Sequence, residues 1–218
     1  MAIVVEHDKR QKQILKKALD VFVEEGFENA TYQKIADRCK ITRTTLYLYF
    51  RNRREIFNYS IKLLLSDVEK DIVGVKENSA LSYPDKIRKT ISVILDRLEE
   101  NKRLLSVILD YLLSLSRTAG SKTPAKGDGF SLPDTRVRRR TIRLRHILAT
   151  MIIEGIKAGE LKQVDVAGAD NLLYGIIELA IFRLAVLKRN SAAELKKVVE
   201  LAVHGLTAVP VKSPESSK

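Results

Sequence analysis

Residues 31–57 read TYQKIADRCKITRTTLYLYFRNRREIF, and this stretch carries the strongest structural signal in the chain. Thr31 and Thr42 each precede a short helical pattern, and threonine is a favoured residue at a helix N-cap. A tight turn at Lys40–Ile41 joins the two predicted helices, which is the spacing of a helix-turn-helix. In that motif the second helix enters the major groove of DNA. The spacing therefore indicates a DNA-binding element.

The two faces of this helix pair differ in chemistry. The inner face is apolar and consists of Ile35, Ala36, Cys39, Ile41, Leu46 and Phe50. The outer face of the second helix carries Arg43, Thr44, Thr45, Tyr47, Leu48 and Tyr49. Arg, Thr and Tyr side chains donate hydrogen bonds to phosphates and base edges. We interpret Cys39 as a small core residue rather than a redox sensor.

The residues of this stretch resemble the DNA-binding signature of TetR-family transcriptional regulators. The matching positions are Thr31, Ile35-Ala36, Thr42, Thr45 to Phe50, Asn52-Arg53 and Glu55-Ile56, with Phe22, Gly26 and Phe27 upstream. Lys40 stands where the family usually has Gly, and Arg53 where it usually has Lys. The resemblance implies an all-α fold of about nine helices, with an N-terminal helix-turn-helix domain and a helical ligand-binding and dimerisation domain. It also implies operator DNA, a second copy of the chain and a small effector as partners.

Roles follow from the resemblance position by position. Backbone contacts to DNA are expected from Thr31, Tyr32, Thr42, Tyr47, Tyr49 and Arg53. Base reading is expected from Arg43 and Thr44, with Gln33 and Thr45 as further candidates. Each has a plainer alternative, because Thr31 and Thr42 can be caps alone, Tyr47 can belong to the core, and Arg43 can be a solvated charge.

Composition limits the other functional classes. The 218 residues hold 39 Lys and Arg against 27 Asp and Glu, and the net charge of +12 suggests a polyanionic partner. The positive excess is spread along the chain rather than gathered at one end. No apolar stretch is long enough for a membrane span, no secretory signal is recognisable, and one Cys fits a reducing cytoplasm. Three widely separated His suggest no metal, cofactor or catalytic site, so we expect no enzyme.

The remaining chain also reads as helix. We predict a DNA-binding domain over 8–55, a linking helix over 53–72, a ligand-binding and dimerisation domain over 56–207 and a flexible tail over 208–218. Further helices are predicted over 8–25, from Pro84 through Leu98, and over 102–116, 135–157, 166–188 and 192–206, with loops at 74–83 and 118–134. The pocket is expected to be lined by Ile91, Ile94, Leu98, Leu105, Ile108, Leu112, Leu148, Ile152, Leu173, Tyr174, Ile177 and Glu178.

One predicted helix is apolar on nearly all sides. From Leu172 to Leu187, thirteen of sixteen residues are apolar, so the helix must be buried on more than one side. It is either the central helix of a monomeric bundle or part of a subunit interface. For an interface we expect Ile181, Leu184, Leu195, Val199, Ala202 and Leu206. Tyr174 and Glu178 either face a ligand or form an interface pair.

These observations lead to a repressor released from its operator by an apolar or amphipathic ligand. The alternatives are a DNA-binding regulator whose pocket is filled by its own side chains and, more remotely, a small helical enzyme. The basic run Thr135–His146 is either a solvated face or a site for an acidic ligand or second DNA segment.

Overall fold

The computed structural model describes residues 2–119, 133–189 and 192–208. These residues form nine helices, α1 (Ala2–Asn29), α2 (Tyr32–Cys39), α3 (Arg43–Tyr49), α4 (Arg53–Glu77), α5 (Tyr83–Glu100), α6 (Lys102–Ala119), α7 (Pro133–Lys157), α8 (Val166–Ala185) and α9 (Ala192–Leu206). The prediction of an all-α chain of about nine helices is confirmed. None of the helices within these ranges is long and apolar enough to cross a membrane.

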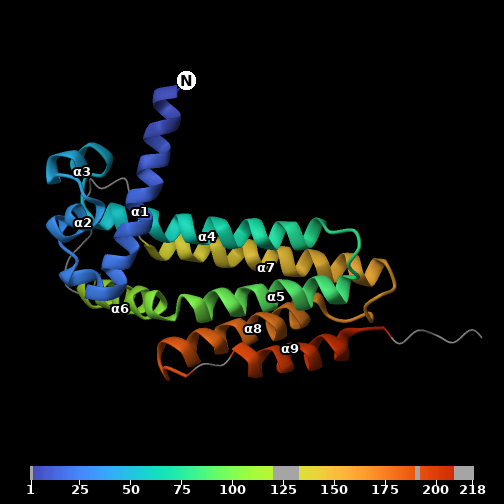
Figure 1. Ribbon diagram of the computed structural model, residues 1–218. Helices are drawn as coiled ribbons and strands as arrows, with labels where there is room; N and C mark the ends of the chain where they lie inside the picture. The colour runs from blue at the N-terminus through green and yellow to red at the C-terminus, as the bar shows by residue number, and fades with distance from the viewer. Residues whose placement is uncertain (1, 120–132, 190–191, 209–218) are drawn as a thin grey trace, which may run out of the picture.

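The helices divide into a small unit and a longer body (Figure 1). α2 and α3 lie at one end beside α1, and α4 runs from there along the body next to α7. α8 and α9 lie on the opposite side of the body from α4. α4 therefore connects the helix-turn-helix directly with the larger bundle.

Two clusters of buried side chains correspond to this division. The first contains residues of α1, α2, α3 and the start of α4, together with Leu104, Val107 and Tyr111 of α6. The second joins α5, α7, α8 and α9 with Ile72 near the end of α4. α6 thus packs with the N-terminal unit through one of its faces, although the sequence places it well inside the second predicted domain.

Several helix ends differ from the prediction. α1 begins at Ala2 rather than near Asp8, while its helical geometry breaks at Gly26, where φ is 76°. α4 continues through Gly74 to Glu77, because the internal glycine, which costs about 1 kcal/mol, is outweighed by packing at buried Ile72. α8 ends at Ala185, three residues earlier than expected. The predicted loop over 74–83 is correspondingly shorter, because α4 ends at Glu77.

Three predictions fall largely on residues outside the described ranges. Residues 120–132 of the predicted loop, Ser191 as a cap and residues 209–218 of the predicted tail are not described. At the loop margins, α6 extends to Ala119 and α7 begins at Pro133.

Candidate nucleic-acid interface and ligand cavity

Two threonine caps build the helix-turn-helix. The Thr31 side chain accepts a hydrogen bond from the Lys34 amide at 3.2 Å, and Thr42 accepts one from the Thr45 amide at 3.1 Å. Between them, Lys40 adopts φ 56° and ψ 47°, the left-handed conformation that the turn requires. Both caps and the turn lie where the sequence predicts them.

The recognition helix α3 turns its outer residues to solvent. Arg43, Thr44 and Leu48 are exposed, and Leu48 shows 76% of its surface. On the opposite face Leu46 is fully buried between α1 and α2. The exposed residues offer a guanidinium, a hydroxyl and an apolar group, which suit guanine acceptors, phosphates and the thymine methyl respectively. Sequence reasoning gave Leu48 no role.

Two predicted backbone-contacting tyrosines form one unit. The rings of Tyr32 and Tyr47 stack with centroids 4.5 Å apart, and the Tyr32 hydroxyl donates to the Phe50 carbonyl at 2.7 Å. Burial, followed by the charges of Tyr47 and Glu55, raises the pKa of Tyr32 to about 12. Tyr47 is half exposed and extends outward. Tyr32 therefore supports Tyr47 from within, while its own hydroxyl is already engaged.

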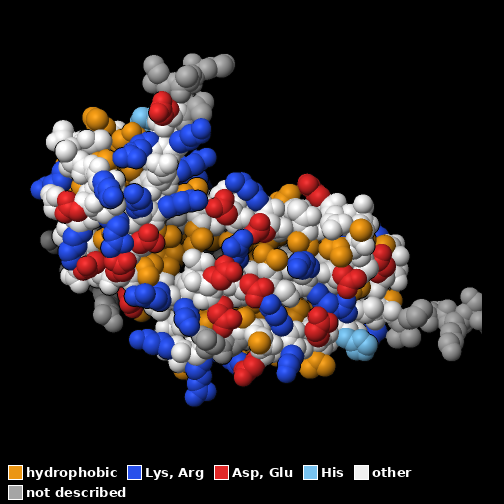
Figure 2. Space-filling view, in the orientation of Figure 1, with side chains coloured by type: hydrophobic (Ala, Val, Ile, Leu, Met, Phe, Trp, Pro, Cys, Tyr) orange, Lys and Arg blue, Asp and Glu red, His pale blue; other side chains and the backbone are white. Residues whose placement is uncertain are grey.

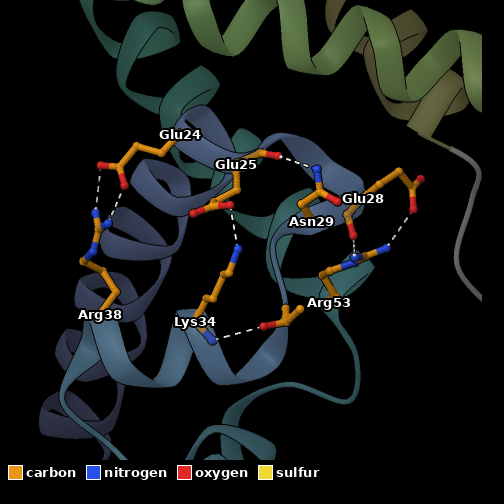
Figure 3. Close-up of polar contacts among 8 residues, drawn as sticks. Glu24, Glu25, Glu28, Asn29, Lys34, Arg38 and Arg53 are labelled. Carbon is orange, nitrogen blue, oxygen red and sulfur yellow. Dashed lines mark hydrogen bonds and ion pairs between the residues drawn. The ribbon is translucent and has the colours of Figure 1, made fainter.

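Three ion pairs join α2 and the start of α4 to the end of α1 (Figure 3). Glu24 pairs with Arg38, and Glu25 with Lys34 at 2.6 Å. The Arg38 hydrogen bond holds the pKa of Glu24 below its usual value. Both basic residues are therefore partly neutralised by glutamates of α1, and α2 presents less positive charge to DNA than its own sequence suggests.

Arg53 is the third of these cations. It donates to the Glu28 backbone carbonyl, lies 3.2 Å from the Glu28 carboxylate and covers the Phe27 ring at 4.5 Å from its centroid. The predicted phosphate contact would thus compete with contacts inside the chain. Gln33 is engaged similarly, because its amide donates to Asp37 at 2.7 Å.

The first turns of α1 add a basic surface that the sequence analysis did not single out. The described side chains of Lys9, Arg10, Lys12, Lys16 and Lys17 are all exposed. Figure 2 shows Lys and Arg gathered over α1 and the neighbouring helix-turn-helix, whereas both signs of charge mix over the body. His7 stacks on Tyr49 of α3, with centroids 4.6 Å apart. This contact places the start of α1 beside the recognition helix.

An apolar cavity of about 220 Å³ lies inside the body. Of the predicted lining residues, the structure brings six to it: Ile94, Leu98, Leu105, Ile108, Tyr174 and Ile177. The sequence analysis missed the wall from α4, namely Ile61, Leu64, Leu65, Val68, Glu69 and Ile72. It also missed Arg97, Asn101, Leu104, Arg143, Leu144 and Ile147, and it assigned Ile181 to an interface.

The other predicted lining residues lie elsewhere. Ile91, Leu148, Ile152 and Leu173 are buried in the body core, and Leu112 is half-buried on α6. Glu178 is exposed, so it is not a buried polar group facing a ligand. These side chains were chosen for apolar periodicity, which does not separate a packed core from a cavity wall.

The predicted interface residues also belong mostly to the chain's own core. Leu184, Leu195, Val199 and Leu206 are buried, and Ala202 is half-buried against the same cluster. The exposed apolar side chains of the two last helices are different residues: Leu172, Leu179, Phe182, Val198 and Leu201. An apolar surface therefore exists on α8 and α9, but other residues form it than the predicted ones.

Part of the basic run of α7 can be located. The side chains of residues 133–138, 140 and 141 are outside the described set, whereas Arg139 and Arg143 are exposed. Arg145 pairs with buried Asp170 at 2.7 Å and lies over the Tyr174 ring. The run thus mixes structural and surface cations. Cys39 is buried as expected, and burial raises the pKa of its thiol.

The N-terminal unit matches a known family. Residues 14–59 match the model described as bacterial regulatory proteins, tetR family. Among curated proteins, the chain is similar to a fatty acid metabolism regulator protein of Bacillus subtilis, with 26% identity over 207 residues that cover 91% of this chain and 97% of that protein. Matches to two uncharacterized Bacillus subtilis regulators span only 56% and 34% of their lengths.

Solved structures share the whole architecture. A TetR transcription regulator from Haloarcula marismortui aligns with a TM-score of 0.72 at 19% identity, covering 92% of this chain and 99% of that one. FadR of Bacillus subtilis, in complex with stearoyl-CoA, aligns with a TM-score of 0.64 at 23% identity, covering 89% and 98%. At these identities the likeness shows the fold.

Proposed function

Because the chain belongs to the tetR family of bacterial regulatory proteins, we propose that it binds a two-fold symmetric operator and represses transcription from it. The observation that carries the proposal is the exposed outer face of α3 on a capped helix-turn-helix. Arg43 and Thr44, in the first turn of that helix, read base edges. Thr42, Tyr47 and Tyr49 hold the phosphate backbone, which positions the helix without reading sequence.

We propose further that a ligand in the body cavity releases the operator. Most of the side chains that line the cavity are aliphatic, so the ligand carries a long apolar chain. The fatty acid metabolism regulator of Bacillus subtilis and the structure of FadR from the same organism in complex with stearoyl-CoA support this choice. We therefore propose a fatty acyl compound. Such a ligand regulates only if it binds the DNA-free arrangement more tightly than the DNA-bound one.

The operator geometry needs two copies of the chain. Half-sites lie one helical turn apart or a multiple of it, so two reading heads must be held at a fixed separation. We propose that the apolar surface of α8 and α9 forms the dimer contact. A regulator of this kind acts where the DNA is, which places it in the cytoplasm.

The proposal is tested in two steps. Selection from random double-stranded DNA should recover a palindromic motif, and titration of stearoyl-CoA should then dissociate the protein from a duplex bearing it. Failure to recover any motif contradicts the operator-binding function. Recovery of a motif with no effect of acyl ligands would favour the alternative, a regulator whose cavity holds no inducer.

A further inference from the structure

The cavity opens beside charged residues of α7. Arg143 lines the cavity together with its neighbours Leu144 and Ile147, and its side chain is 65% exposed. Arg139 lies one helical turn earlier on the same helix and is also exposed. One stretch of α7 therefore offers apolar groups to the inside of the cavity and the Arg143 guanidinium at its edge, with exposed Arg139 one turn away.

The present partner of Arg143 comes from the facing helix. Arg143 Nη1 lies 3.5 Å from Oε1 of Glu69, which belongs to α4 and also lines the cavity. Pairs this exposed contribute only about 0.2–1 kcal/mol, so another anion can replace the carboxylate at little cost. Arg97, the second lining arginine, is held more firmly by Asp71 at 2.8 Å and Glu100 at 3.1 Å.

The size of the cavity indicates how a ligand acts. Its 220 Å³ is below the range of roughly 300–1,000 Å³ for pockets that enclose drug-sized ligands. A fatty chain therefore widens the space between the helices that line it.

We propose that Arg143, with Arg139 beside it, is the head-group site for an anionic amphiphile whose chain occupies the cavity, and that the anion replaces Glu69 as the partner of Arg143. This inference rests on the proposed ligand-released function and adds the charge and placement of the ligand. The anion is either a fatty carboxylate or the phosphates of an acyl-CoA thioester, which share this chemistry.

The exchange of partners links ligand binding in the cavity to the DNA-binding unit. Glu69 belongs to the helix whose first residue, Arg53, is tied to Glu28 at the end of α1. Loss of the Arg143 contact removes an ion pair between α4 and α7. The movement is then carried along one continuous helix to the helix-turn-helix.

Calorimetric titration with matched probes tests the head-group site. Decanoate, decanoyl-CoA and 1-decanol carry ten-carbon chains with carboxylate, phosphate-bearing and neutral heads. Wild type should bind decanoate or decanoyl-CoA more tightly than decanol. Arg143→Gln should weaken binding of the preferred anionic probe by roughly tenfold or more, which is the effect of losing one hydrogen bond to a charged group, and should leave decanol unchanged. A larger effect of Arg139→Gln on decanoyl-CoA than on decanoate identifies the phosphates as the anion.

Glu69→Gln should change the affinity for the anionic probe in the opposite direction. It removes the competing carboxylate, so the anionic probe should bind more tightly while decanol does not change. Arg88→Gln is the control for Arg143→Gln, because Arg88 likewise forms ion pairs, with Asp85 and Glu200, but lies outside the cavity. Equal binding of all probes, indifferent to Arg143 and Glu69, overturns the head-group site and leaves the apolar ligand intact. Failure of every probe to bind rejects the cavity as a ligand site and, with it, the ligand-dependent part of the proposed function.

Discussion

Lys40 holds a backbone conformation that suits glycine better than lysine. Its φ of 56° lies in the left-handed region, where a side chain costs about 1–2 kcal/mol. Its side chain is exposed, so removing it leaves no hole. Lys40→Gly should therefore raise the free energy of unfolding by about 0.5–1 kcal/mol, because the relieved strain exceeds the added entropy of the unfolded chain. Urea unfolding monitored by circular dichroism measures the change.

A matched substitution separates strain from a general effect of removing a lysine. Lys12 is exposed within α1, where glycine costs about 1 kcal/mol of helix propensity. Lys12→Gly should lower stability while Lys40→Gly raises it. A loss of stability in both variants would show that the turn is not strained.

Arg43 gives the sharpest test of DNA reading. Its exposed guanidinium follows the Thr42 cap and can donate two parallel hydrogen bonds to O6 and N7 of guanine. Arg43→Ala should cost about 1–3 kcal/mol of specific binding per half-site and leave the fold intact. Selection from random DNA should then lose a fixed G in each half-site.

The competing role for Arg43 is a phosphate contact. In that case affinity falls equally for all sequences, the slope of binding against salt decreases, and the selected motif is unchanged. Arg51→Ala serves as the control, because Arg51 is exposed just outside α3 and should not alter the motif.

Local sequence patterns predict some side-chain contacts of this chain and miss others. Thr31 and Thr42 were identifiable because a cap depends on the amide three residues later. The occupation of Arg53 was not, because its partner Glu28 lies 25 positions earlier in the chain. A side chain that suits DNA by type can already be bonded at long range.

Among the elements, α6 makes the most specific connection between the two halves of the molecule. Tyr111 packs against Phe27 at 4.2 Å and Phe57 at 5.2 Å between ring centroids, while Ile108, one turn earlier, lines the cavity. The Tyr111 hydroxyl is buried without a hydrogen-bond partner among the described residues, and burial raises the pKa of this phenol. The Tyr111 ring therefore stabilises the packing of α6 on the N-terminal unit, whereas its unsatisfied hydroxyl lowers the stability of the chain.

Tyr111→Phe should stabilise the chain. An unsatisfied buried polar group costs about 1–3 kcal/mol, and phenylalanine keeps the ring contacts while removing that group. We expect the free energy of unfolding to rise by about 1 kcal/mol in a urea titration. Tyr32→Phe should do the reverse, because the Tyr32 hydroxyl donates to the Phe50 carbonyl. Equal losses in the two variants would mean that the Tyr111 hydroxyl makes a favourable contact.

Helix ends and helix faces were predicted unequally well. α2 and α3 are short, capped and amphipathic, and their N-caps and the turn between them lie where the sequence predicts them. α4 passed through Gly74 because tertiary packing outweighs one unfavourable residue. α8 is apolar on nearly all sides, so periodicity could not distinguish its core face, with Leu173 and Leu184, from its exposed face.

Over the whole molecule, the fold was recoverable from the sequence to a greater degree than the cavity. Helix number and order follow from local patterns. The cavity depends on how five helices fail to close against one another, and its α4 wall comes from the helix assigned only as a link. The charged edge with Arg143 and Glu69 depends on a contact between two helices that are far apart in the sequence, which no local spacing encodes.

The exposed apolar surface of α8 and α9 has the form of a helix-pair interface. Leu172, Leu179 and Phe182 recur on one stripe of α8, and Val198 and Leu201 continue the surface on α9. A Cβ added at Gly175 or Gly205 would meet no heavy atom within 4 Å, so both glycines are open to close approach by another helix. An apolar surface of this kind, shared by two helices, suits a self-complementary contact about a two-fold axis.

Charge introduced at the centre of this surface should therefore separate the subunits. Leu201 is 74% exposed and Phe182 49% exposed, so glutamate at either position is solvated in a monomer but buried unpaired in the dimer. Wild type should be a dimer at micromolar concentration in light scattering, with an interface above roughly 2,000 Å² if it is obligate. Phe182→Glu and Leu201→Glu should yield folded monomers that bind a single half-site weakly. Val73→Glu, on an exposed apolar residue of α4 away from this surface, should remain dimeric. A monomeric wild type would contradict the dimer. Dimers of all three variants would show that another surface joins the two subunits.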